Sequence, residues 1–318
     1  MLLSNKGLKC DIQEIKKLKY LKIVDLSFNY INSDIQIFKE INNITELNLA
    51  YNYFYGNINE LNIKNVSNLN LKYNKLHGNV DLFTVNHNNL KIFDIGYNYF
   101  GKQSIPKFNK DIEYINIARN NFYGDLDNIL DYSKLKIFDI SFNNFDIHSP
   151  VNVSSLKNLN VINVRYNNFR KLFIMSNKVK YYDTAYNTID DNLKNLNVLN
   201  ESYIDISNNI INIVFNNSLK EIIDKNYVKL NNNIFRCGNN SKYYPYWVYN
   251  YYPNINYCQD YDNTMFNIQI KKYYVEFIVI LASFVMYICI TGLLFIYCHN
   301  KFKQKKIENY EKQTLISD

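Results

Sequence analysis

Apolar and polar residues recur in a fixed order along residues 1–236. In each segment two apolar residues stand two positions apart, and an asparagine follows three positions after the second one. Val24, Leu26 and Asn29 show this order. Alternation with a period of two predicts a short strand with one buried face. The polar residues after it predict a turn that leads the chain away from the sheet.

The segment returns every 20 to 24 residues as L-x-x-L-x-L-x-x-N-x-L, with other apolar residues at several leucine positions. Its asparagines are Asn29, Asn52, Asn74, Asn98, Asn120, Asn143, Asn167, Asn187, Asn209 and Asn233. A period of this length predicts a solenoid, because stacked coils bury an apolar face that one coil cannot bury alone. An amide at the same place in every coil can bond backbone groups of adjacent coils. We therefore predict a structural ladder of these asparagines.

This pattern resembles the leucine-rich repeat family over about residues 1–258. Asn52–Ile58, Asn74–Val80 and Asn120–Leu126 are similar to the N-x-L-x-G-x-I of its plant-type extracellular repeats. The resemblance implies an α/β fold: a curved solenoid with a parallel β-sheet on the concave face and loops or short helical turns on the convex face. The glycine of each segment is expected to make a tight turn. Repeats without it, such as the one with Asp146, are expected to be less regular on the convex side.

Both ends of the repeat array carry expectations. Counting one period back from the first ladder asparagine reaches Lys6, so the chain starts inside a repeat. We expect an N-terminally shortened sequence that lacks a cap and a signal peptide. At the other end, Asn233–Gly238 followed by Trp247 resembles the C-terminal cap of extracellular repeat domains. That resemblance implies a Cys237–Cys258 disulfide and an oxidising compartment. Two free buried thiols are the alternative.

Residues 277–298 contain no charged side chain. At 1.5 Å per residue such a helix crosses the hydrocarbon core of a bilayer, so we predict one transmembrane α-helix over residues 275–298. Four lysines follow it closely, which favours a cytoplasmic tail over 299–318 and repeats outside the cell, at the plasma membrane. The predicted organisation is about ten repeats (1–236, the first truncated), a cap (237–258), a juxtamembrane stalk (259–274), the helix and the tail.

Charge and composition add little to this picture. A net charge of +7 over 318 residues, without a block of Lys or Arg, does not predict a nucleic-acid partner. Asparagine occurs 56 times, and the ladder accounts for ten of these residues. Six asparagines stand in glycosylation sequons, of which about four are expected by chance. They are Asn43, Asn65, Asn152, Asn200, Asn216 and Asn239.

No constellation of catalytic residues emerges from the sequence. The four histidines are dispersed, without cysteine or acid at the spacing of metal ligands, so neither a metal nor a cofactor is predicted. Gly96, Gly101 and Lys102 have the spacing of a phosphate-binding loop, but Gln103 replaces the required Ser or Thr. We therefore predict a protein that is not an enzyme.

The residue immediately before each ladder asparagine is aromatic in seven of ten repeats. We predict that this column binds a ligand on the concave face, since rigid aromatic rings beside amides and carboxylates suit a peptide or a sugar chain. The candidate binding residues are Phe28, Tyr51, Tyr73, Tyr97, Arg119, Phe142, Tyr166 and Tyr186. A second column, from Asp25 to Lys229, supplies the amides and carboxylates. The alternative is that both columns only stabilise neighbouring strands.

The whole layout resembles a receptor-like protein with extracellular repeats, one membrane helix, a short tail and no kinase. That resemblance implies a non-catalytic recognition protein for a protein, peptide or glycan ligand, which acts through a membrane co-receptor or adaptor. Two alternatives stay open. An adhesion or cell-wall-binding protein would use the same concave face, and a tail-anchored intracellular scaffold would have the opposite topology.

Overall fold

A parallel sheet of ten short strands is the backbone of the fold. The computed structural model describes residues 1–9, 12–175, 178–191, 193, 196, 200–236 and 245–252. The strands are neighbours in the order of the chain, so every coil adds one strand beside the last. They are β1 (Ile23–Asp25), β2 (Glu46–Asn48), β4 (Asn68–Asn70), β6 (Ile92–Asp94), β8 (Tyr114–Asn116), β10 (Ile137–Asp139), β12 (Val161–Asn163), β14 (Tyr181–Asp183), β15 (Tyr203–Asp205) and β17 (Tyr227–Lys229).

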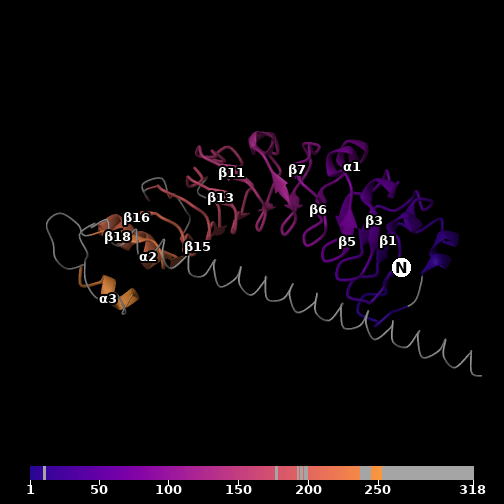
Figure 1. Cartoon of the computed structure of the whole chain (residues 1–318), viewed down its shortest axis with the longest axis horizontal. Helices are drawn as coiled ribbons and strands as arrows, with labels where there is room; N and C mark the ends of the chain where they lie inside the picture. The colour runs from indigo at the N-terminus through magenta and orange to yellow at the C-terminus, as the bar shows by residue number, and fades with distance from the viewer. Residues whose placement is uncertain are drawn as a thin grey trace, which may run out of the picture. The chain divides into compact units, whose positions relative to one another are not determined.

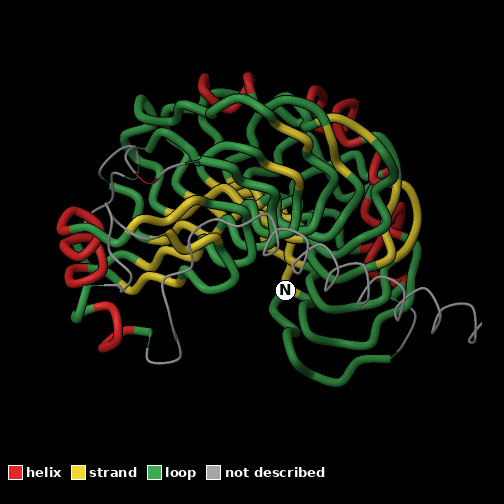
Figure 2. Tube along the Cα trace, turned by 60° about the vertical axis from the view of Figure 1, so that its left-hand side comes forward, coloured by secondary structure: helices red, strands yellow, loops and turns green. Residues whose placement is uncertain are grey.

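The strands and the helices lie on opposite sides of the coils. Figure 1 shows the coils side by side, and Figure 2 shows the strands of the ten-stranded sheet along the inner side, with the short helices and some further strands outside. The α-helices are α1 (Val80–Asn86), α2 (Asn217–Lys225) and α3 (Val248–Tyr251). Single 3-10 turns are η1 (Gln13–Lys17), η2 (Ile35–Phe38), η3 (Ile58–Glu60) and η4 (Asp127–Asp131). The predicted parallel sheet with loops and short helical turns is therefore confirmed.

A second set of strand pairs forms on the far side of the turns. The pairs are β3 (Tyr55–Asn57) with β5 (Lys75–His77), β7 (Gln103–Ser104) with β9 (Phe122–Tyr123), β11 (Asp146–Ile147) with β13 (Asn168–Phe169), and β16 (Asn212–Val214) with β18 (Ile234–Arg236). Asp146 belongs to β11 although no glycine stands at this place. The strand pairing thus persists without the glycine. The convex side of this repeat is nevertheless less regular, as expected, because no helical turn lies in the described residues between β11 and β12, whereas η3, α1 and η4 follow the glycine-containing segments.

Apolar columns from successive coils form one continuous core. The middle residue of each strand pairs in register with the middle residue of the next, as Val24 does with Leu47 and Phe93 with Ile115. These side chains point inward and are buried. Because the register never slips, each apolar residue stacks on its counterpart one coil away. The core is thus a set of parallel columns.

Ladder asparagines tie each coil to the one before it, and Asn98 shows the geometry. Its Oδ1 accepts a hydrogen bond from the Leu76 N–H in the preceding coil at 3.0 Å. Its Nδ2 donates to the Leu71 carbonyl of that coil and to the Ile95 carbonyl of its own, each at 3.0 Å. The other nine asparagines make the same three contacts.

Aromatic packing covers the last described coil. Trp247 meets Phe215 edge to face with ring centroids 5.7 Å apart, and Tyr252 lies 5.9 Å from Phe215. Val248, in α3, is fully buried beneath them. Residues 245–252 therefore shield the apolar end of the solenoid from water.

Several predicted features lie outside the described residues. They are the Cys237–Cys258 disulfide, the sequon at Asn239, the stalk, the transmembrane helix over residues 275–298 and the tail. Within the described ranges, the helices are all too short or too polar to span a membrane.

Removing one ladder amide should cost a large part of the stability of the solenoid. We expect Asn98→Ala to lower the free energy of unfolding by about 3 kcal/mol, because it leaves buried backbone groups in two coils without partners. Urea unfolding followed by circular dichroism measures the change. The exposed Asn88→Ala is the matched control and should shift it by less than about 0.5 kcal/mol. Equal effects of both variants would show that the ladder is not structural.

The buried His87 makes stability depend on pH. It is 4% exposed, its Nδ1 lies 2.7 Å from the Phe83 carbonyl, and burial lowers the pKa of its imidazole below 6.5. The unfolded chain therefore takes up this proton first as the pH falls, which removes stability below about pH 6.5. We expect the loss between pH 7.5 and 5.5 to be smaller in His87→Gln than in the parent chain. The exposed His77→Gln should retain the parent's full loss.

Candidate functional site

Each strand is followed by a turn with the same geometry in every coil. In the first coil Asp25 Oδ1 accepts a hydrogen bond from the Ser27 N–H at 2.9 Å, Phe28 has φ of 54°, and Asn29 follows. The left-handed residues of the ten coils are Phe28, Tyr51, Tyr73, Tyr97, Arg119, Phe142, Tyr166, Tyr186, Asn208 and Asn232. The predicted aromatic column therefore lies in this turn, directly beyond the carboxyl ends of the strands rather than on the strands themselves.

A left-handed backbone is unfavourable for a bulky side chain, so other interactions must hold it. In nine of these ten residues, from Phe28 to Asn208, the N–H donates across to the next coil, as Phe28 does to the Ala50 carbonyl at 2.9 Å and Tyr73 to the Gly96 carbonyl at 2.9 Å. Toward the preceding coil, the ladder asparagine that follows holds the turn by hydrogen bonds to backbone groups of that coil. The side chain at this position projects outward from a turn that the backbone has already determined.

Rings on neighbouring turns stack face to face. The centroids lie 4.4 Å apart for Phe28 and Tyr51, 4.5 Å for Tyr51 and Tyr73, and 3.8 Å for Tyr73 and Tyr97. Arg119 continues the stack, because its guanidinium lies 5.3 Å from the Tyr97 ring centroid and 4.2 Å from that of Phe142. These contacts join the stacked side chains from Phe28 in the first coil to Phe142 in the sixth.

The stack resumes beyond Arg119 in the same geometry. Phe142 and Tyr166 lie 4.4 Å apart, and Tyr166 and Tyr186 lie 4.1 Å apart. The structure thus brings all eight predicted binding residues into one row, in which most ring faces are covered by neighbours. What the row offers to solvent is ring edges and phenol hydroxyls.

A groove runs beside the first six members of this row, from Phe28 to Phe142. The residues directly after the ladder asparagines, Tyr30, Tyr53, Lys75 and Tyr99, form its second wall, and the asparagines lie between the walls. The volume is about 880 Å³ and the lining extends from Asn5 to Phe142. Hereafter this feature is called the tyrosine groove. Sequence reasoning missed the second wall, although the residue after each ladder asparagine is as periodic as the one before it.

The hydroxyl of Tyr73 keeps its proton at neutral pH. Burial raises the pKa of Tyr73 well above 10, and the adjacent Tyr97 and Tyr51 raise it further. Its hydroxyl therefore stays protonated. In the second wall of the groove, Tyr99 is 68% exposed. The groove combines fixed hydroxyls with accessible aromatic surface, which is the composition of protein interfaces.

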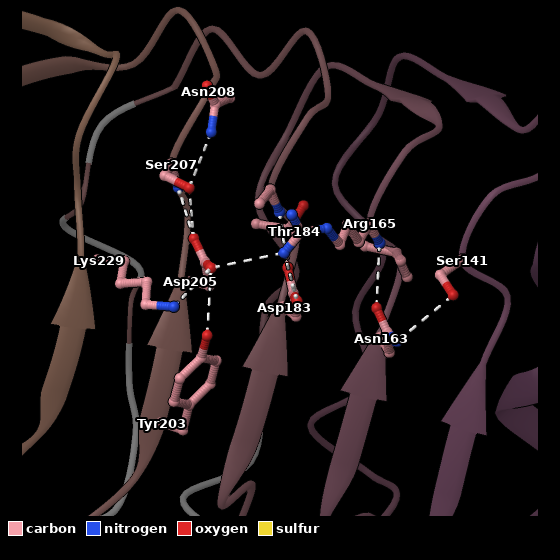
Figure 3. Close-up of polar contacts among 12 residues, drawn as sticks. Ser141, Asn163, Arg165, Asp183, Thr184, Tyr203, Asp205, Ser207, Asn208 and Lys229 are labelled. Carbon is pink, nitrogen blue, oxygen red and sulfur yellow. Dashed lines mark hydrogen bonds and ion pairs between the residues drawn. The ribbon is translucent and has the colours of Figure 1, made fainter.

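A polar cluster occupies the concave face near the other end of the sheet (Figure 3). Asp205 is 2% exposed, and its Oδ2 accepts from the Tyr203 hydroxyl at 3.2 Å and lies 3.8 Å from Lys229 Nζ. Arg165 lies 3.4 Å from Asp183 and 3.8 Å from Asp205. Burial raises the pKa of Asp183, although the backbone N–H of Ala185 and the Arg165 guanidinium act against the rise. Two acids and two bases thus balance each other within the cluster.

The acidic and amide side chains at the ends of the strands form hydrogen bonds within the turns that follow. In nine coils the side chain accepts a hydrogen bond from the N–H two residues later, as Asp94 does from Gly96 and Asp139 from Ser141. The exception among the ten is Lys229, in β17, the last strand of the ten-stranded sheet. These residues stabilise the backbone, so the tyrosine groove is the better candidate for binding.

Known structures with the same arrangement decide the fold. The Arabidopsis HAESA ectodomain, solved with an IDA peptide hormone ligand, matches with a TM-score of 0.58 at 20% identity, over 73% of this chain and 41% of that one. The fold is a leucine-rich repeat solenoid. A repeat protein of Leptospira interrogans matches with a TM-score of 0.57 at 20% identity, over 73% of this chain and 60% of its own. A plant ice-binding protein gives 0.55 at 16%, over 72% and 79%.

These likenesses concern the repeats alone. The chain spans less than half the length of the plant receptor chains that it matches, 37% for the one solved as PEPR1-AtPEP1 and 44% for RGFR1 with RGF2. No family model and no curated protein matches the sequence.

The remaining predicted sites fall on the surface of the repeats. The five sequon asparagines within the described residues, Asn43, Asn65, Asn152, Asn200 and Asn216, are all exposed. Asn216 also caps α2, since its Oδ1 accepts from the Leu219 N–H at 2.9 Å. In the part of the chain that the structure describes, no His, Cys, Asp and Glu side chains gather into a group that could hold a metal ion.

Stacked rings should couple energetically. We expect Tyr73→Ala and Tyr97→Ala to show a coupling free energy of about 1 kcal/mol in a double-mutant cycle measured by urea unfolding. Both substitutions place alanine in the same left-handed turn, so that cost cancels in the cycle. Tyr73→Ala with Tyr166→Ala is the matched control and should be additive within about 0.5 kcal/mol. A coupling near zero in the first pair would contradict a stabilising stack.

Proposed function

We propose that this protein is a non-catalytic recognition protein, which binds a protein or peptide ligand in the tyrosine groove. The observation that carries the proposal is the groove itself: two aromatic walls with the ladder asparagines between them, about 880 Å³ in volume, along the first six coils. Tyrosine is enriched where proteins bind partners, because its ring contributes contact area and its hydroxyl a directed hydrogen bond.

Similar folds lend support to a peptide ligand. PEPR1 was solved as PEPR1-AtPEP1, and the HAESA ectodomain with a peptide hormone ligand. A glycan remains the second candidate, which the aromatic side chains favour. Mutual stacking counts against it, since the faces of Tyr51 and Tyr73 that a sugar ring would need are already covered.

The proposal includes a membrane anchor. The uncharged segment 277–298, followed by four lysines, is the basis for a single-pass protein of the plasma membrane with its repeats outside and its C-terminus in the cytoplasm. The exposed sequons are compatible with N-glycosylation on that side. The protein would then act through a co-receptor or an adaptor. An adhesion or cell-wall-binding protein and a tail-anchored intracellular scaffold are the alternatives.

Exposed groove tyrosines should be required for binding but not for folding. We expect phage-displayed random peptides selected on the full chain to stain intact cells that express it, and to lose at least tenfold in affinity for Tyr53→Ser/Tyr99→Ser. Tyr20→Ser/Tyr123→Ser is the matched control outside the groove lining and should bind like the parent chain. All three chains should unfold at similar urea concentrations.

Each negative result has a distinct meaning. Peptides that bind the groove variant as well as the parent would overturn the groove as the site. Peptides that bind the purified chain but stain cells only after permeabilisation would overturn the extracellular topology and favour the intracellular scaffold.

A further inference from the structure

The charged residues that line the tyrosine groove are all of one sign. Among the described residues that line it, Lys75 and Arg119 are charged and none is acidic. Two further cations lie over rings of the groove: Lys9 Nζ is 5.3 Å from the Tyr30 ring centroid, and Lys72 Nζ is 5.7 and 5.5 Å from those of Tyr73 and Tyr97. Four cations therefore surround one groove that has no acid in its described lining.

This excess is local, because the next hollow along the row differs. It is lined by Asn143, Asn144, Asp146, Tyr166, Asn167, Asn168 and Tyr186. Its charged lining residue is Asp146, and no lysine or arginine belongs to its described lining. One cation, Arg165, lies over its rings, 5.3 Å from the Tyr166 centroid and 4.8 Å from that of Tyr186. The concave cluster of Arg165 and Lys229 is balanced by two buried carboxylates. Among these surfaces, the tyrosine groove has two lining cations, Lys75 and Arg119, and no acid in its described lining, although Lys72 beside it also interacts with the buried Asp94 and Asp139.

From this charge pattern we infer that the ligand segment bound in the tyrosine groove is an acidic peptide. This inference rests on the proposed function and adds the ligand's chemistry. The phenol hydroxyls of Tyr51, Tyr73 and Tyr97 can donate hydrogen bonds, as can the four cations, so the groove offers donors to carboxylates and backbone carbonyls. Arg119 holds its planar fork at the end of the groove, where it suits a carboxylate in two-point contact.

Other anionic ligands fit these walls less well. Single-stranded nucleic acids and acidic glycans gain much of their affinity by stacking bases or sugar rings on free aromatic faces. Here the rings of the row that forms the first wall cover each other's faces, with neighbouring ring centroids 3.8 to 4.5 Å apart. In the second wall, Lys75 Nζ lies over the face of Tyr53, 5.1 Å from its ring centroid. Tyr99, which is 68% exposed, keeps accessible aromatic surface. Elsewhere edges, hydroxyls and cations remain, and these match a peptide with carboxylate side chains.

Binding of defined probes to the full chain tests this inference. The probes are a fluorescent peptide of alternating Glu and Gly, its Gln–Gly and Lys–Gly counterparts, oligogalacturonate and oligothymidylate. We expect the Glu–Gly peptide to bind most tightly, with an affinity that falls as salt is raised. Lys75→Gln and Arg119→Gln should each weaken it about three- to tenfold, in line with exposed charge-assisted contacts.

Lys102→Gln is the matched control, because this lysine lies over Tyr123, whose ring is outside the groove lining. It removes the same charge and should leave the affinity unchanged. An equal loss in Lys102→Gln would show a response to net charge alone and would overturn the inference. Tighter binding of the Gln–Gly peptide, the Lys–Gly peptide or either polymer would do the same.

Random-peptide selection separates this inference from the proposed function. Selected sequences that depend on Tyr53 and Tyr99 and are enriched in Asp and Glu support both. Groove-dependent sequences without acidic enrichment would reject the acidic ligand and leave the recognition function standing. If no selected sequence depends on the groove, the proposed function itself fails.

Discussion

Hydrogen bonding of the turn after each strand is the constraint on which the whole structure depends. The chain must leave the sheet there without leaving buried amides unpaired. Two side chains satisfy this need in nine of the ten coils. The residue at the end of the strand, such as Asp94, holds the N–H two positions on, and the ladder asparagine, such as Asn98, bonds backbone groups in its own coil and in the preceding one. Between them stands one residue in a left-handed conformation.

That left-handed residue connects the fold to the candidate site. Its backbone is determined by the coils on both sides, so its side chain is free to vary, as the change from Tyr186 to Asn208 shows. Because parallel strands lie about 4.8 Å apart, side chains on successive turns come within stacking distance. Tyrosine at this position therefore stabilises the stack and lines the groove at once. The structural role and the binding role of the column are compatible.

The two ends of the solenoid carry different surfaces on the same scaffold. Early coils present tyrosine edges and unpaired cations such as Lys75 and Arg119. Later coils place Arg165 and Lys229 on the concave face, where Asp183 and Asp205 neutralise them. The repeat backbone is unchanged, because Asp183 and Asp205 still accept the turn hydrogen bonds of Ala185 and Ser207 through Oδ1, while their Oδ2 atoms face the cations. Function can therefore be confined to a few coils without disturbing the stack.

The sequence by itself determined the period, the parallel sheet and the ladder positions, because these follow from spacing along the chain. It also identified the aromatic column from Phe28 to Tyr186. Only the tertiary structure decided how these side chains are used. It showed that Asp25 and its counterparts secure their own turns, that Tyr30, Tyr53 and Tyr99 form a second wall, and that Asp146 pairs in a strand without a glycine. The reason is physical: spacing fixes which residues recur, but contacts arise only when neighbouring coils are superposed.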